Sequence, residues 1–273
     1  GGGSVDVGEV AESVGSLDWN RVRYAESLRE SLDPEVLAAA HSIRSAMDVI
    51  FALLVDGGSG VRERQLASID ETLGGDHRER VEAMLKPLSR IDPRHRLPLV
   101  ELSLPALKRR PRSALRLYLK TIEKLIHADG DINSFEFAIS RLVRVYLIEA
   151  MDPESDQDDN RELREVRREV AVLLSVLARA GHTSESDARR AFIAGWHHLF
   201  PSSDGDYQPP RDWVDAATDA LDRLDELAPL FKEELIAAML RTLSHDNRIT
   251  LDELELLRAT CAALHCPMPP TVG

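Results

Sequence analysis

Apolar residues recur every three or four positions along most of the chain, which is the spacing of one face of an α-helix. In the first part of the sequence this pattern predicts six helices, over residues 19–31, 34–41, 43–55, 61–73, 76–90 and 99–107. Residues 57–60 and the pair Gly74 and Gly75 separate helices there, because glycine interrupts helical structure. Leu97 and Pro98 predict a turn before the last of the six.

The strongest pattern covers residues 113–147. Its apolar stripe consists of Leu115, Leu119, Ile122, Leu125 and Ile126. The stripe breaks at residues 128–132 and a second helix follows, which predicts a helical hairpin. At the start of that helix, Asn133 and Glu136 have the three-residue spacing of a capping box. Beyond it, further helices are predicted over residues 161–180, 184–199, 211–228, 229–244 and 250–264.

An internal repeat appears when the second half of the sequence is shifted back by 117 positions. The aligned pairs are Asp129 with Asp246, Ile132 with Ile249, Glu136 with Glu253, Ile139 with Leu256, Arg141 with Arg258, and Leu147 with Leu264. Gly130 faces Asn247, and both residue types favour the tight turn after a helix. Asn133 faces Thr250, and both cap helices. Two equivalent hairpins are therefore expected, with Thr250 and Glu253 forming the second capping box.

Composition supports a helical, globular protein. Aromatic residues make up only 5% of the 273 positions, and Ala, Leu, Glu and Arg are abundant, so we expect an all-α fold arranged as a multi-helix array. The length is that of roughly two domains. We predict a flexible linker over residues 1–17, a first helical half over 18–151, an acidic linker over 152–160 and a second helical half over 161–273.

The charge balance bears on the choice of partner. The 47 acidic and 34 basic residues give a net charge of -13, which disfavours duplex nucleic acid or an anionic membrane as the main partner. The apolar stretches 49–55 and 170–178 are about half the length of a membrane-spanning helix, so no spanning segment is predicted. One dense basic run, residues 108–112, is interpreted as a solvated corner or as an intramolecular partner of the acidic linker.

The Asp-Gly turn at residues 129–130 resembles the second half of a calcium-binding EF-hand loop. The first and third positions of such a loop would be Leu125 and His127, which are not hard oxygen ligands. We therefore expect the turn acids to bind local backbone amides. The alternative is a metal site formed by acidic residues of the two turns, namely Asp129, Asp131, Glu136, Asp246 and Glu253.

Motifs for catalysis are absent from the sequence. It contains no H-E-x-x-H zinc motif, no G-x-S-x-G nucleophile elbow and no glycine-rich phosphate loop. Cys261, His265 and Cys266 offer an alternative soft-metal cluster, although two small thiols buried at a helix end is the preferred interpretation. We predict no catalytic residue, no bound cofactor and no enzymatic activity in this chain.

Several short runs together resemble the C-terminal region of bacterial membrane zinc metallopeptidases of the HtpX and CAAX-protease type. These runs are residues 50–54, 64–66, 96–102, 104–107, 125–130, 135–136, 178–182 and 264–269. The Asp-Gly hairpins separately resemble TerB-like modules, a helical fold of tellurite-resistance and envelope-stress proteins.

The resemblance implies a soluble appendage of a membrane-anchored protease, on the cytoplasmic side of the bacterial inner membrane. In that family the zinc is bound by an N-terminal catalytic domain whose H-E-x-x-H motif this chain lacks, so no family residue is carried over. The expected role is non-catalytic, namely binding a protein partner, recruiting substrate or regulating the attached protease domain. The alternative is a TerB-like module that binds or senses metal.

Overall fold

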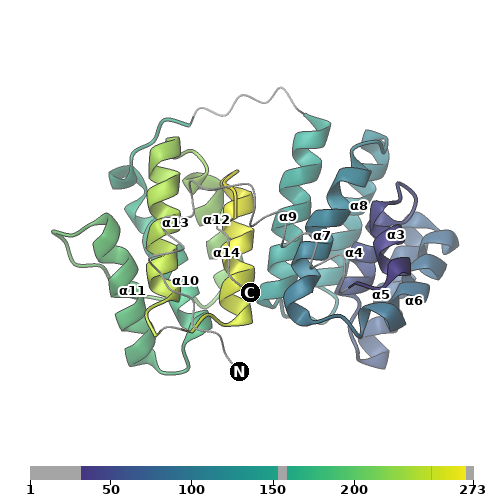
Figure 1. Cartoon of the computed structure of the whole chain (residues 1–273), viewed down its shortest axis with the longest axis horizontal. Coiled ribbons are helices and arrows are strands. Elements are labelled where there is room, and N and C mark those ends of the chain that lie inside the picture. Colours follow the sequence, from purple (N-terminus) through teal and green to yellow (C-terminus); the bar gives the residue numbers. More distant parts are fainter. Residues whose placement is uncertain (1–31, 153–158, 247, 269–273) are drawn as a thin grey trace. The chain divides into compact units, whose positions relative to one another are not determined.

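The computed structural model describes residues 32–152, 159–246 and 248–268. Within these ranges the regular structure is helical, and two single residues, Arg161 and Leu227, form an isolated β-bridge without belonging to a strand. The predicted all-α class is confirmed (Figure 1). The helix predicted over residues 19–31 and the linker over 1–17 lie outside the described residues.

The chain divides at residue 155 into two compact units, an N-terminal unit with the described residues 32–152 and a C-terminal unit with the described residues 159–246 and 248–268. The division at 155 falls inside the acidic stretch 152–160. The helices on each side of it are described separately below.

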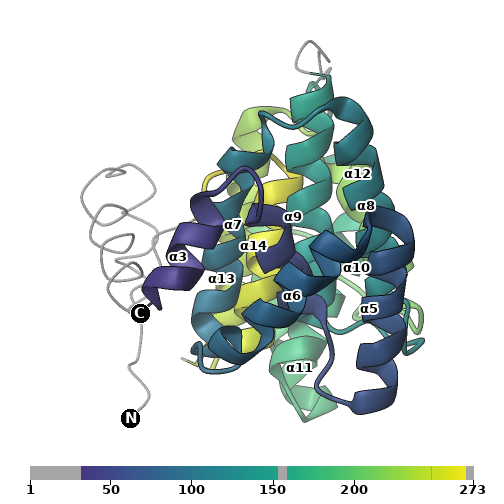
Figure 2. The ribbon, with the colours of Figure 1, turned by 90° about the vertical axis from the view of Figure 1, so that its right-hand side faces the viewer.

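The N-terminal unit is built around a short, almost completely buried helix, α4. The helices of this unit are α3 (Pro34–His41), α4 (Ala46–Leu54), α5 (Ser59–Leu73), α6 (Gly75–Leu88), α7 (Arg96–Leu107), α8 (Arg112–Ile126) and α9 (Ser134–Met151), with a 3-10 turn, η2, at Pro93–His95. Eight of the nine residues of α4 are buried, and the helix packs against α6, α7 and α3. Figure 2 shows α5 and α6 from the side, with α8 next to α5.

The C-terminal unit has α10 at its centre. Its elements are η3 (Leu163–Val166), α10 (Arg167–Gly181), α11 (Glu185–Leu199), α12 (Trp213–Leu224), α13 (Pro229–Leu243) and α14 (Leu251–Ala263). The helix α10 contacts each of the other four helices, because an apolar stripe at helical spacing faces the core. The buried residues of this stripe include Val170, Leu173, Leu174 and Leu177.

The predicted helices agree with the structure within a few residues, with two corrections. The turn predicted at Leu97 and Pro98 is wrong, because α7 begins at Arg96 and includes both residues. Proline is accommodated there, since the N–H groups of a first helical turn have no acceptor within the helix. The helix predicted from residue 161 begins as an α-helix only at Arg167, after the 3-10 turn η3.

The repeat extends over three helices instead of two. Shifting α7 by 117 positions gives the bounds of α12, and shifting α8 gives those of α13. The starts of α9 and α14, Ser134 and Leu251, are related by the same shift. Both units therefore contain an equivalent helical triplet, whereas the TerB-like nature of the hairpins stays a prediction.

A buried ionic cluster, not predicted from the sequence, joins α4 to α6. Asp48 on α4 is fully buried, and its two carboxylate oxygens contact His77 Nδ1 and Arg80 Nε on α6. The rings of His77 and of Tyr118 on α8 form a T-shaped pair, with ring centroids 6.0 Å apart. Helices α4, α6 and α8 therefore meet near the Asp48 carboxylate. Its removal would leave His77 and Arg80 without their acidic partner.

We expect Asp48→Ala to lower the free energy of unfolding by about 3 to 5 kcal/mol, the cost of removing one partner of a buried ion pair. Urea unfolding followed by circular dichroism measures the change. The matched control is Asp76→Ala on α6, because the Asp76 side chain is 81% exposed and its ion pair with Arg44 is worth no more than about 1 kcal/mol. An equal effect of both substitutions would contradict a structural role for the cluster.

Candidate functional site

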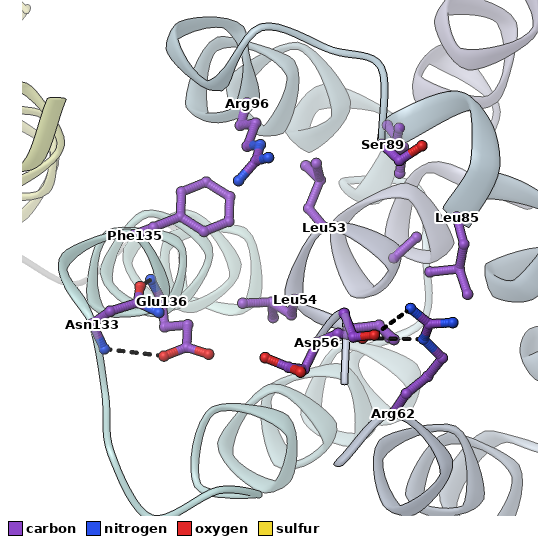
Figure 3. Close-up of a pocket in the computed structure, with 14 residues that line it drawn as sticks. Leu53, Leu54, Asp56, Arg62, Leu85, Ser89, Arg96, Asn133, Phe135 and Glu136 are labelled. Atoms are coloured by element: carbon purple, nitrogen blue, oxygen red, sulfur yellow. Dashed lines mark hydrogen bonds between the residues drawn. The ribbon is translucent and has the colours of Figure 1, made fainter. Parts of the chain in front are cut away.

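A pocket of about 360 Å³ lies in the N-terminal unit where α4 ends. Its lining comes from the C-terminal end of α4 and the turn that follows, from α5 and α6, and from the starts of α7 and α9 (Figure 3). Volumes in this range are typical of sites for small molecules or for a few side chains of a peptide. The pocket combines an apolar wall with charged groups of both signs.

The turn after α4 is held open by two polar side chains of α5. Gln65 is buried, and its amide nitrogen donates to the carbonyl oxygens of Leu54 at 3.1 Å and Leu125 at 3.0 Å, while its oxygen accepts from the N–H of Asp56 at 2.8 Å. Arg62 donates to the carbonyl oxygens of Asp56 and Gly57 at 3.1 and 2.8 Å. These bonds satisfy backbone groups beyond the helix end, so the turn needs no packed neighbour on the pocket side.

Two carboxylates form the acidic side of the pocket. Glu136 and Asp56 face each other in Figure 3. Burial raises the pKa of Glu136, the hydrogen bond from the N–H of Asn133 opposes this rise, and the nearby charges of Asp129, Asp56 and Asp131 add to it. A carboxylate in this position is stabilised by any cation that enters the pocket.

The remaining wall is apolar, with one guanidinium at its edge. Leu53, Leu54, Leu85 and Leu88 supply the aliphatic surface. Arg96, at the first position of α7, lies over the ring of Phe135 at 5.7 Å from the centroid, a cation–π contact. The pocket thus offers aliphatic surface and carboxylates side by side.

The predicted capping residues are where the sequence placed them. Asn133 accepts from the N–H of Glu136, and Glu136 accepts from the N–H of Asn133, each at 3.0 Å, which closes the first capping box. Thr250 and Glu253 form the second, at 3.3 and 2.8 Å. Asn133 and Glu136 also line the pocket, so one side-chain pair both starts α9 and shapes the site.

In each turn a further aspartate accepts a hydrogen bond from a backbone N–H group. Asp129 accepts from the N–H of Asp131 at 3.2 Å, and Asp246 accepts from the N–H of Arg248 at 3.0 Å. Of the five acids proposed as metal ligands, Asp129, Asp131 and Glu136 belong to the hairpin of the N-terminal unit, and Asp246 and Glu253 belong to that of the C-terminal unit. In the described part of the chain, no group of three or more His, Cys, Asp or Glu side chains is arranged to hold a metal ion.

Cys261, His265 and Cys266, the alternative soft-metal ligands, lie at the end of α14. Cys261 is buried, Cys266 is half-buried, and neither forms a disulfide. The ring nitrogen Nδ1 of His265 lies 3.0 Å from a carboxylate oxygen of Asp225. Burial raises the pKa of the Cys266 thiol, which disfavours the thiolate that a metal would need.

The glutamate of the second capping box, Glu253, is more deeply buried than its counterpart Glu136 in the first. Glu253 is only 1% exposed, whereas Glu136 is half-buried. The end of α10 lies directly against Glu253, because a Cβ atom on Gly181 would be 1.7 Å from its carboxylate. Burial raises the pKa of Glu253, the hydrogen bonds from Thr250 oppose this, and the charge of nearby His182 opposes it further.

Comparisons with protein-family models, with curated proteins and with solved structures gave no match. Among the described residues, no single helix has the length and apolarity to cross a membrane. The pair formed by α3 and α4, which are bent by 117° relative to each other, reaches that threshold by length and composition alone.

The raised pKa of Glu253 gives a pH-dependent contribution to stability. Because its neutral form is favoured in the folded state, this contribution is fully present below the pKa of the unfolded chain and is lost as the pH rises through the folded pKa. Relative to Glu253→Gln, which stays neutral and keeps a carbonyl oxygen for the cap, the native protein should lose stability as the pH rises above the ordinary glutamate pKa of 4.5. Thermal unfolding of both proteins over a range of pH that begins below this value measures the difference.

The control for this experiment is Glu233→Gln, a substitution of an exposed glutamate on α13. Its stability should follow that of the native protein throughout the range. A constant difference between native protein and Glu253→Gln at all pH values would contradict the assignment.

Proposed function

We propose that this chain is a non-catalytic helical domain that binds a protein partner, and that the pocket at the end of α4 is its contact site. The observation that carries the proposal is the pairing of an aliphatic wall with the facing carboxylates of Asp56 and Glu136. A peptide segment with an apolar side chain and a neighbouring Lys or Arg fits both features.

The energetics favour such a ligand over a purely apolar one. Moving an apolar side chain from water onto the leucine wall contributes about 1.5 to 3 kcal/mol when burial is complete. A basic side chain would supply the counter-charge that Glu136 lacks in its partly buried position, and its hydrogen bonds to a carboxylate would be charge-assisted. Selectivity for a basic segment therefore comes from the acids and affinity from the leucines.

We further propose that the domain is attached to a membrane-anchored zinc metallopeptidase and faces the cytoplasm. The support for this part is the resemblance of the short runs described from the sequence. In that setting the pocket would recruit substrate or hold a segment of the protease itself, and zinc would be bound by the attached catalytic domain. The coding sequence upstream of this chain tests the attachment, since it should encode membrane helices and an H-E-x-x-H motif.

Peptide binding tests the pocket directly. The probes are fluorescent ten-residue peptides that carry one leucine and one lysine three positions apart, with versions that have glutamine or glutamate in place of the lysine. We expect binding of the lysine peptides, weaker binding of the glutamine peptides and the weakest binding of the glutamate peptides. The double substitution Asp56→Asn with Glu136→Gln should reduce lysine-peptide affinity about tenfold, which corresponds to about 1.4 kcal/mol.

Two further variants separate the pocket from the rest of the surface. Leu53→Glu places a charge on the apolar wall and should abolish binding of every peptide. Leu230→Glu is the matched control, because Leu230 is 64% exposed on the C-terminal unit and is not one of the residues that line the pocket. Unchanged affinity in Leu53→Glu, with its helical spectrum intact, would refute the pocket as the contact site.

A further inference from the structure

The exposed side of α8 carries a row of cations, here called the basic stripe and defined as Arg112, Arg116 and Lys120. These residues are four positions apart and all are exposed, so they lie on one face of the helix. The run continues into the basic corner before α8. Between residues 108 and 124 the sequence contains seven Lys or Arg residues and a single acid, Glu123.

The neighbouring cations already have contacts within the unit. Lys108 lies over the ring of Tyr146 at 5.2 Å, Arg110 lies over Tyr118 at 5.7 Å, and Lys124 donates to Thr72 at 3.0 Å. By contrast, no described acidic side chain forms an ion pair with a residue of the basic stripe. The stripe is therefore a concentration of like charge that forms no ion pair with the described residues of its unit.

The second unit shows that the fold does not require the stripe. The helix α13 has the bounds of α8 shifted by 117 positions, and the residues that correspond to the stripe are Pro229, Glu233 and Ala237. An equivalent helix therefore forms with no cation at these three positions. Like charges four residues apart also destabilise a helix by a few tenths of a kcal/mol per pair, so the stripe carries a cost that helix formation does not explain.

We propose that the basic stripe is a docking surface for an acidic peptide segment of a partner protein. The stripe spans nine residues from Arg112 to Lys120, whose Cα atoms are about 12 Å apart along the helix, and an extended segment of about four to six residues matches this length. Glutamate or aspartate side chains along the segment would pair with the guanidinium and ammonium groups. Leu117, which is 41% exposed and follows Arg116 at the edge of the stripe, offers the segment an apolar contact.

The charge of the whole chain selects a short acidic segment over a larger polyanion. At physiological salt, charges separated by more than about 8 Å are largely screened, so a short segment responds mainly to the stripe. A membrane surface or a nucleic-acid duplex would also approach the acidic remainder of a chain whose net charge is -13. The exposed positions of the stripe hold no aromatic residue on which a nucleobase would stack.

The test uses a fluorescent eight-residue peptide with five glutamates and one leucine, and a glutamine version of the same peptide. We expect saturable binding of the glutamate peptide to the full chain, weakening as salt is raised, and at least tenfold weaker binding of the glutamine version. The triple substitution Arg112→Glu, Arg116→Glu and Lys120→Glu should reduce glutamate-peptide affinity at least tenfold. Circular dichroism establishes that the variant keeps its helical content.

A control with the same net charge isolates the stripe. Arg164, Arg189 and Arg241 are exposed cations of the C-terminal unit, and replacing all three with glutamate should change affinity less than about twofold. Equal loss in both triple variants would overturn the proposal, as would equally tight binding of phosphatidylserine vesicles or duplex DNA. Because the lysine peptides that probe the pocket should still bind the stripe variant, failure of this proposal is distinguishable from failure of the pocket.

Discussion

The capping box at the start of α9 connects local folding to the candidate site. A helix begins with backbone N–H groups that have no acceptor, and Asn133 and Glu136 satisfy two of them reciprocally. The same bond fixes the Glu136 carboxylate beside the turn that follows α4, where it meets Asp56. The pocket therefore depends on Glu136, which also caps α9. A backbone hydrogen bond from Asn133 holds its carboxylate in position.

The elements that the sequence predicted well are those specified by neighbouring residues. Helix spacing, glycine breaks and capping boxes are local, so α3 was predicted with its observed bounds and both caps at the observed residues. Leu97 and Pro98 were misassigned because a proline pattern does not distinguish a turn from a first helical turn. The shift of 117 positions was visible in the hairpin, and helix bounds extended it to α7 and α12.

The sequence did not predict the role of Gln65 at the pocket or the buried ionic cluster, because both depend on contacts between distant positions. Gln65 is an ordinary helical residue in the sequence, and only the fold brings its amide to the carbonyl oxygen of Leu125. Asp48 lies within an apolar run, where its pairing with His77 and Arg80 has no local signature. A charged residue inside an otherwise buried helix was the available signal, because such a residue requires a partner.

Comparison of the two units indicates how one helical scaffold acquires different surfaces. In the C-terminal unit, Gly181 allows the end of α10 to cover Glu253, whereas in the N-terminal unit the equivalent residue Glu136 is half-buried and lines the pocket. The repeated triplet forms whether this glutamate is buried or half-buried, because apolar stripes and capping residues determine where its helices begin and end. The pocket with its facing acids and the basic stripe, which forms no ion pair with a described acidic side chain, both belong to the N-terminal unit, so both proposed contact surfaces lie on that unit.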